Sequence, residues 1–358
     1  MPEKVLIHPA AYSNVSRAVE RVFELFPLQL RGKRVLVKPN VLRASEAAES
    51  IVTNPAVLRA VVEKVETMGP ASIVVGDNPG LFSYGANEES FKKTGLMEAS
   101  KGYYQNIGND SVKVAFNAAF LPSVSVSRAV MEADVIISLP KFKTHGLTVM
   151  TGAIKNSYGI LPGAQKAMLH KAAGSPERFH EVVVEVFRLR VPDLFIVDAV
   201  VGMQGNGPAS PDLRNIGLVL ASDNAVAVDA VIATMMGCEP GRLRFLRKAK
   251  EAGLGDYDLA AAEIIGELKR LPDFKLPPMG GEALMKNESM QSMLHSRAVL
   301  RPKAGPERCT GCGTCVDHCP VSALSINGQK NIPEVDPDVC IACFCCQEMC
   351  PEKAITLR

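Results

Sequence analysis

The chain has 358 residues, 47% of them hydrophobic, and its 40 basic and 38 acidic residues leave a net charge of only +2. The length allows one large and one small domain, and the near-neutral charge and absence of Trp argue against a general nucleic-acid binder. No segment approaches about 18 uninterrupted apolar residues, and no charged N-terminal region precedes an apolar run, so we expect neither a membrane span nor a signal peptide. We therefore expect a soluble cytoplasmic protein whose clustered thiols serve metal or redox chemistry rather than disulfides.

Most of the chain alternates apolar runs with amphipathic segments. This predicts an α/β domain over residues 1–270, with a mainly parallel sheet flanked by helices. Residues 14–26 place six apolar side chains on one helical face, and Asn54, Pro55 and Gly69 predict the cap, first residue and end of the next helix. The predicted strands are "RVLVK" (34–38), "SIVVGD" (72–77), "DVIISLP" (134–140), "LFIVDA" (194–199) and "IGLVLAS" (216–222).

Charged or amide side chains follow all five predicted strands, at the ends where open α/β sheets bind ligands. They are Lys38 and Asn40, Asp77 and Asn78, Lys141, Lys143 and His145, Asp198, and Asp223. A single residue of this kind is usually a helix cap, which is our interpretation of Asp223, but five strand ends together favour a site.

The segment 135–176 contains five Lys and two His but no Asp or Glu. Lys141, Lys143 and His145 occupy alternate positions, which share a face in an extended strand. The motif "GAIKNSYG" adds Lys155 and Asn156. The lack of acids favours an anion site for phosphate or carboxylate, or a docking face for the cysteine-rich C-terminal segment, over a solvated basic surface.

Two further motifs lie before residue 240. Asp229 stands in the otherwise apolar helical segment "NAVAVDAVIATMMG", where a carboxylate should be paired or functional. Pairing to a lysine of the basic segment is the simpler expectation. The glycine-rich "GMQGNGP" (202–208) matches neither a dinucleotide nor a Walker pattern and indicates a turn.

These observations give two sets of candidate residues. The catalytic candidates are His145, Lys141, Lys143 and Lys155, and the ligand-binding candidates are Lys38, Asn40, Asp77, Asn78, Asn156, Asp198 and Asp229. Prolines and glycines then mark a connector over 271–298, and the Met-rich "EALMKNESMQSMLHSRAV" (282–299) is helical in pattern.

Nine of the ten cysteines lie between residues 309 and 350, within a predicted domain over 299–358. "CTGCGTCVDHCP" (309–320) and "CIACFCCQEMCP" (340–351) both follow C-x2-C-x2-C-x3-C-P, the bacterial ferredoxin run whose fourth cysteine binds the other cluster. Zinc sites do not double this pattern. We predict a small α+β ferredoxin-like domain with two 4Fe–4S clusters, one held by Cys309, Cys312, Cys315 and Cys350, the other by Cys319, Cys340, Cys343 and Cys346.

Cys345 falls between the predicted ligand positions. The favoured interpretation is a small residue packed beside the cluster, or a weak S–H donor that tunes it. The alternative is a replacement ligand in a damaged or converted cluster.

Several motifs together resemble one known family. "VLVKPN", "PKFKTH", "GAIKNSYG", the "GNGP" loop after Asp198 and "SDNAVAVD" resemble domain-of-unknown-function family 362, in its form with a C-terminal two-cluster ferredoxin domain. The resemblance covers nearly the whole chain, and "CFCC" is similar to that family's second motif. Ala342 stands where ferredoxin motifs often carry Gly, and Ala199 stands where members of the family often carry Gly. Neither change removes a cluster ligand. The resemblance implies an iron–sulfur protein and adds little about substrate.

Three functions stay open at this stage, and the sequence does not decide whether the chain is an enzyme. The first is an electron-transfer protein that passes low-potential electrons through two clusters to or from a partner enzyme or an anionic ligand held by the α/β domain. The second is a reductase with its own substrate site, in which His145 or a lysine donates protons. The third is a non-catalytic iron–sulfur sensor or scaffold.

Overall fold

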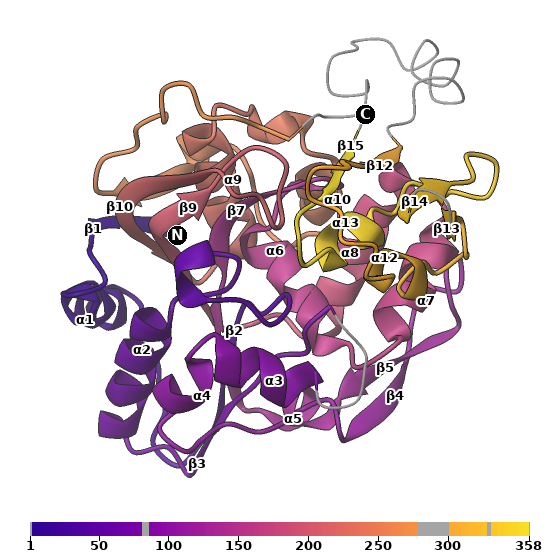
Figure 1. Cartoon of the computed structure of the whole chain (residues 1–358). Coiled ribbons are helices and arrows are strands. Elements are labelled where there is room, and N and C mark those ends of the chain that lie inside the picture. Colours follow the sequence, from indigo (N-terminus) through magenta and orange to yellow (C-terminus); the bar gives the residue numbers. More distant parts are fainter. Residues whose placement is uncertain (1, 81–85, 278–300, 328–330, 358) are drawn as a thin grey trace.

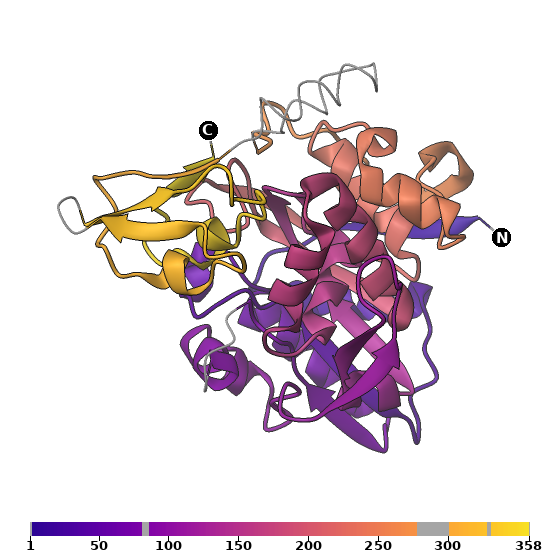
Figure 2. The same cartoon turned by 90° about the vertical axis from the view of Figure 1, so that its right-hand side faces the viewer.

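The computed structural model describes residues 2–80, 86–277, 301–327 and 331–357. A large α/β domain carries a small cysteine-rich domain on one side (Figures 1 and 2). The helix predicted over 282–299 and most of the predicted connector lie outside the described residues, and the boundaries at 270 and 299 stay predictions. No helix in the described ranges is long and apolar enough to cross a membrane.

A nine-stranded sheet forms the centre of the large domain, in the order β11-β1-β10-β9-β6-β2-β3, with β7 paired to β9 and β8 paired to β7. Its strands are β1 (Glu3–Pro9), β2 (Arg34–Pro39), β3 (Ser72–Val75), β6 (Val135–Leu139), β7 (Lys141–His145), β8 (Val149–Met150), β9 (Leu194–Met203), β10 (Leu213–Ser222) and β11 (Ala262–Ile265). The strands β3, β2, β6 and β9 are parallel, whereas β10 pairs antiparallel with both β9 and β1. The predicted mainly parallel α/β fold is confirmed, and all five predicted strands are present.

Helices cover both faces of this sheet because neighbouring strand residues point to opposite sides. Leu36 of β2 joins one apolar cluster with α6, α8, α9 and α10, whereas Val35 and Val37 join a second cluster with α1 and α2 (Figure 1). The helices are α1 (Val15–Leu25), α2 (Pro55–Thr67), α3 (Ala86–Lys93), α4 (Leu96–Ala99), α5 (Arg128–Glu132), α6 (Gly152–Asn156), α7 (Gln165–Ala173), α8 (Pro176–Leu189), α9 (Ala225–Met235) and α10 (Arg244–Glu251). A hairpin of β4 (Ser111–Ala115) and β5 (Ser123–Ser127) lies apart from the main sheet.

Local signals explain where two of these helices begin. The Asn54 side chain accepts a hydrogen bond from the Ala56 N–H at 2.9 Å and caps α2, as predicted. For α9 the prediction was wrong by one residue. Asn224, not Asp223, caps that helix, because its side-chain oxygen accepts from the N–H groups of Val226 and Ala227.

The cysteine-rich domain is an internal repeat with a spacing of 31 residues. Its elements are β12 (Pro302–Ala304), α12 (Thr314–Asp317), β13 (Leu324–Asn327), β14 (Ile332–Val335), α13 (Cys345–Met349) and β15 (Ile355–Leu357), with β12 paired to β15 and β13 to β14. Left-handed backbone occurs at equivalent positions of both halves, namely Gly311, Gly313 and Ser322 in the first and Ala342, Phe344 and Lys353 in the second. Both copies therefore keep one loop geometry even where the second has no glycine.

Candidate functional site

Four cysteines surround each of two small cavities in the cysteine-rich domain. One is lined by Cys309, Cys312, Cys315 and Cys350, and the other by Cys319, Cys340, Cys343 and Cys346. Each group takes three cysteines from one motif and the fourth from the other, which is the grouping that the spacing predicts.

Backbone N–H groups point at two of these sulfur atoms. The Ala323 N–H donates to Cys319 Sγ at 3.1 Å, and the Ala354 N–H donates to Cys350 Sγ at 3.3 Å. Within the described part of the chain, no three His, Cys, Asp or Glu side chains are placed to hold a single metal ion. Four thiols around one cavity, with N–H groups directed at sulfur, suit a thiolate-bound iron–sulfur cluster.

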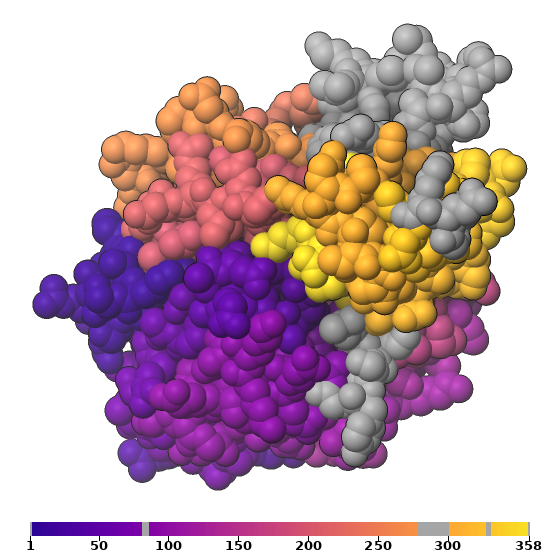
Figure 3. Space-filling model, viewed as in Figure 1, coloured from indigo at the N-terminus to yellow at the C-terminus, as the bar shows by residue number. Residues whose placement is uncertain are grey.

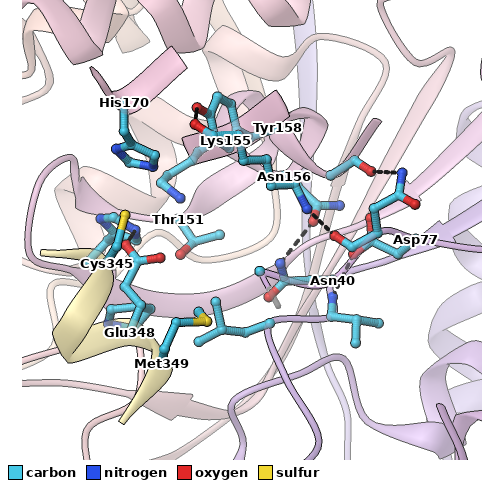
Figure 4. Close-up of a pocket in the computed structure, with 18 of the residues that line it drawn as sticks. Asn40, Asp77, Thr151, Lys155, Asn156, Tyr158, His170, Cys345, Glu348 and Met349 are labelled. Atoms are coloured by element: carbon cyan, nitrogen blue, oxygen red, sulfur yellow. Dashed lines mark hydrogen bonds and ion pairs between the residues drawn. The ribbon is translucent and has the colours of Figure 1, made fainter. Parts of the chain in front are cut away.

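The two domains pack against each other (Figure 3), and a further cavity lies between them (Figure 4). Its volume of about 80 Å³ is room for roughly five water molecules or a small organic ligand. His318 and, from α13, Cys345, Glu348 and Met349 form the wall on the small-domain side, and the other walls belong to the large domain. The predicted site residues that line it are Asn40, Asp77, Asn78, Lys143, His145, Lys155 and Asn156.

A buried ion pair supports the floor of this cavity. Lys38 Nζ lies 2.7 Å from Asp77 Oδ1 and donates to the Asn156 carbonyl at 2.7 Å. Burial lowers the pKa of Lys38, and its attraction to Asp77 opposes this shift. A Cβ atom on Gly159 would lie 2.0 Å from Asp77 Oδ1, so the last glycine of "GAIKNSYG" is required for this close approach.

Asp229 of α9 lies far from α6 in the sequence but caps the N-terminal end of that helix, and it does not line the interdomain cavity. Its carboxylate accepts hydrogen bonds from the N–H groups of Ala153 at 2.6 Å and Ile154 at 3.0 Å. The expected pairing of Asp229 with a lysine is therefore wrong. Burial raises the pKa of Asp229 to about 7, although both N–H groups favour the charged form. Gly152 is needed beside it, because a Cβ there would lie 2.3 Å from the carboxylate.

Lys155 extends from α6 into the cavity (Figure 4). No described residue makes a hydrogen bond or an ion pair with its Nζ, which lies 5.8 Å from the ring centroid of Tyr158. Burial lowers the pKa of Lys155, whereas the charge of Glu348 raises it. Lys155 is thus partly buried, and its ammonium group lines the cavity without a partner among the described residues.

His145 joins the two domains. Its Nδ1 accepts from the N–H of Leu147 at 3.2 Å and of Thr148 at 3.4 Å, which places the ring proton on Nε2. Nε2 lies 2.8 Å from Glu348 Oε1 of α13. Burial lowers the pKa of His145 to about 4, so at neutral pH an uncharged imidazole faces the carboxylate.

Glu348 is the buried acid on the small-domain side of the cavity. Burial alone would raise its pKa, but His145, Lys155 and His170 outweigh this and lower the pKa to about 2. The Glu348 carboxylate is therefore charged at neutral pH. Sequence reasoning missed this residue, because it lies inside a cysteine motif and resembles an ordinary surface acid there.

Two more lysines line the cavity but are occupied by backbone carbonyls. Lys143 Nζ donates to Ile51 O at 2.7 Å, and Lys166 Nζ donates to the carbonyls of Asn78 and Pro79. Burial lowers the pKa of both lysines to about 7. Their role is to hold the loops that shape the cavity, and Lys166, like His170, Thr151 and Tyr158, was not among the predicted candidates.

Lys141 and Asp198 lie away from the cavity. They form an ion pair of 2.7 Å with both side chains fully buried, and Asp198 also accepts from Tyr12 Oη and the Asn54 N–H. The pairing of β7 with β9 shifts register between Lys141 and Lys143. The predicted common face of β7 therefore places only Lys143 and His145 at the cavity.

The glycine-rich turn at residues 202–208 contacts α13. The Gln347 side chain donates to the carbonyls of Asn206 at 3.0 Å and Gly207 at 3.3 Å. A Cβ on Gly207 would lie 2.1 Å from the Thr144 carbonyl, so only glycine lets this turn pack on β7. The motif thus positions the small domain.

Comparison with known proteins agrees with this division into two parts. Residues 35–234 match the family described as Domain of unknown function (DUF362), and residues 308–354 match the 4Fe-4S dicluster domain Fer4_7. A thylakoid-associated protein of Synechocystis sp., sll1697, is 32% identical over 252 residues, which cover 69% of this chain and 77% of that protein.

Two solved structures are similar to this chain at low sequence identity. A structural-genomics protein from Thermotoga maritima is 13% identical with a TM-score of 0.42, covering 68% of this chain and 58% of its own length. The lactate racemase apoprotein from Thermoanaerobacterium thermosaccharolyticum is 11% identical with a TM-score of 0.41, covering 63% and 55%. This chain spans less than two thirds of either protein.

Proposed function

Because this chain belongs to the DUF362 family and ends in a 4Fe–4S ferredoxin-like domain, which supports iron–sulfur electron transfer, we propose that it passes low-potential electrons through two clusters to or from a small anionic ligand held between its domains. Cys309, Cys312, Cys315 and Cys350 would hold the outer cluster, and Cys319, Cys340, Cys343 and Cys346 the inner one. Bound clusters would supply one-electron transfer.

One observation carries this proposal: α13 separates two cavities. Cys343 and Cys346 line the inner four-cysteine cavity, whereas Cys345 and Glu348, their neighbours in sequence, line the interdomain cavity. A ligand in the interdomain cavity would therefore lie within a few residues of the inner cysteines. Electrons would therefore cross only a short stretch of protein between the ligand and the inner cluster.

The outer cysteines suit a protein partner. Cys312 is exposed, whereas Cys346 is buried. A redox partner would therefore meet the first motif, and the ligand in the cavity would meet the second. The predicted cytoplasmic location stays a prediction, since the thylakoid association belongs to the relative alone.

The reductase is the second candidate, and the unpaired lysine in the interdomain cavity favours it. Lys155 would hold an anionic substrate away from bulk water, and His145 would position Glu348 rather than donate a proton itself, because its Nε2 already faces that carboxylate. A carrier that serves only other proteins has no use for a lysine without a partner in a cavity between its domains.

Redox titration of the iron-loaded protein under anaerobic conditions tests the proposal, with acetate as the smallest carboxylate probe. Acetate bound at Lys155 should make the midpoint potential of one cluster more negative, because the added electron is repelled by the bound anion. Lys155→Met should abolish this shift, whereas Lys171→Met, at an exposed position of α7, should keep it. Clusters that dithionite does not reduce, or a shift that survives in Lys155→Met, would overturn the proposal.

A further inference from the structure

Polar groups without partners surround the interdomain cavity on two sides. From them we infer that the ligand is a small carboxylate that also carries a hydroxyl or amino group. Its carboxylate binds Lys155 and Thr151, and its hydroxyl or amino group binds Glu348 and Asn40. This rests on the proposed function only in taking the cavity as the ligand site.

The first side of the cavity donates hydrogen bonds. The Lys155 ammonium has no partner among the described residues, and the Thr151 hydroxyl, on a side chain 3% exposed, has none either. Thr151 precedes α6 but does not cap it, because Asp229 already accepts from the first N–H groups of that helix. The hydroxyl is thus left for a ligand, and a carboxylate suits two donors that line one cavity.

The second side accepts hydrogen bonds. Asn40 Nδ2 donates to Asn156 Oδ1 at 3.0 Å, and Asn156 Nδ2 donates to Ser138 Oγ at 2.9 Å. Asn40 Oδ1 is buried and has no partner in the described part of the chain. The Glu348 carboxylate lines the same cavity, so the two residues offer acceptor oxygens to a donor group of the ligand.

Lys155 and Glu348 line the same cavity without making an ion pair, as Figure 4 shows. A simple anion would satisfy Lys155 but would leave Asn40 Oδ1 unpaired and would be repelled by Glu348. A ligand with both a carboxylate and a donor group satisfies both sides at once.

The size of the cavity limits the ligand further. A volume of about 80 Å³ admits only a small molecule, and the side chains of Leu42 and Met349 close it with apolar surface. Glycolate and glycine therefore serve as probes, since each adds one donor group to the acetate skeleton. The first carries a hydroxyl and the second an amino group, so the two separate these alternatives.

Titration calorimetry on the oxidised, iron-loaded protein tests the inference without any electron transfer. Glycolate or glycine should bind at least tenfold more tightly than acetate at equal ionic strength. Lys155→Met should weaken all three probes at least tenfold, and Lys171→Met should change none. Glu348→Gln should weaken glycolate and glycine but should not weaken acetate.

Equal affinity for acetate and both bifunctional probes, or no binding of any probe, would overturn the inference. Because Glu348→Gln also alters the domain contact, Thr151→Val supplies a second variant within the large domain alone, which should weaken all three probes severalfold. Unchanged binding in Thr151→Val would contradict the assigned carboxylate position. Reduction by dithionite and the potential shift with acetate test the proposed function, whereas calorimetry tests this inference. Failure of the calorimetric test would therefore leave the proposed function intact.

Discussion

The two cysteine motifs share one spacing and one loop geometry, yet they face different surroundings. In the first motif Cys312 and Asp317 are exposed, whereas the equivalent Cys343 is partly buried and Glu348 is buried against the large domain. The first motif thus presents its cysteines to the outside, and the second presents its helix to the interdomain cavity.

Their loops differ in a way that explains this division. Gly311 and Gly313 of the first motif are replaced by Ala342 and Phe344, although all four residues adopt left-handed backbone. Such backbone costs a non-glycine residue about 1–2 kcal/mol. Ala342 and Phe344 are buried in the same apolar cluster as the helices of the large domain, so their burial offsets this strain. The duplication therefore kept the metal-binding geometry and turned one copy into a docking element.

Loss of one cysteine from each motif should give the largest effects. Cys312→Ser and Cys343→Ser should each reduce the iron content from about eight to about four atoms per chain. Only Cys343→Ser should also abolish the potential shift caused by acetate, because it removes the cluster beside the cavity. Iron analysis with anaerobic redox titration measures both, and a shift lost instead in Cys312→Ser would reverse our assignment of inner and outer motifs.

Truncation of Phe344 should weaken the docking of the small domain. Phe344→Ala removes a buried aromatic ring and should destabilise the protein by about 3 kcal/mol. Gly313→Ala, at the equivalent position with open space around it, should cost only about 1 kcal/mol, from the backbone alone. Anaerobic denaturation followed by cluster absorbance compares the two, and equal losses would show that Phe344 is not a docking residue.

Glu348 and Asp317 occupy equivalent positions of the two motifs, and replacing each acid by its amide should affect stability differently. Glu348→Gln removes a buried charge that faces His145 and Lys155 and should destabilise the domain contact by about 1–3 kcal/mol. Asp317→Asn, on the exposed side of α12, should change stability by less than about 0.5 kcal/mol. The same denaturation experiment measures this pair, and a loss in Asp317→Asn as large as in Glu348→Gln would contradict the inward role of the second motif.

The smallest expected effect concerns Cys345. Its thiol donates to Cys343 and lowers the pKa of that cysteine, just as the Thr314 hydroxyl contacts Cys312 in the first motif and lowers the pKa there. Removing one such donor in Cys345→Ala should make the potential of the inner cluster more negative, on the order of tens of millivolts. Thr314→Val should do the same to the outer cluster. An inner cluster lost altogether in Cys345→Ala would instead support the interpretation of Cys345 as a ligand.

The features of this protein that are local in sequence could be predicted. Asn54 caps α2 through its own neighbours, and the cysteine spacing groups the thiols that surround each cavity. Contacts between distant segments could not be predicted. Glu348 meets His145 from more than 200 residues away, and Asp229 binds the N–H groups of α6 because burial leaves those donors without water.

The sheet shows the same limit. The alternation of strands and helices predicts parallel neighbours, and this holds for the adjacent strands β3, β2, β6 and β9. It says nothing of β1, which pairs antiparallel with β10 at residues more than 200 positions away. The pattern also predicted that Lys141, Lys143 and His145 share one face. The pairing of β7 with β9 shifts register between Lys141 and Lys143, and Lys141 forms an ion pair with Asp198 instead.

The position of iron tests the central claim most directly. Anomalous diffraction from anaerobically grown crystals of the iron-loaded protein should show two four-iron centres, with one bound by Cys319, Cys340, Cys343 and Cys346 directly behind the wall formed by Cys345 and Glu348. A single centre, or an inner motif without iron beside this cavity, would contradict the account.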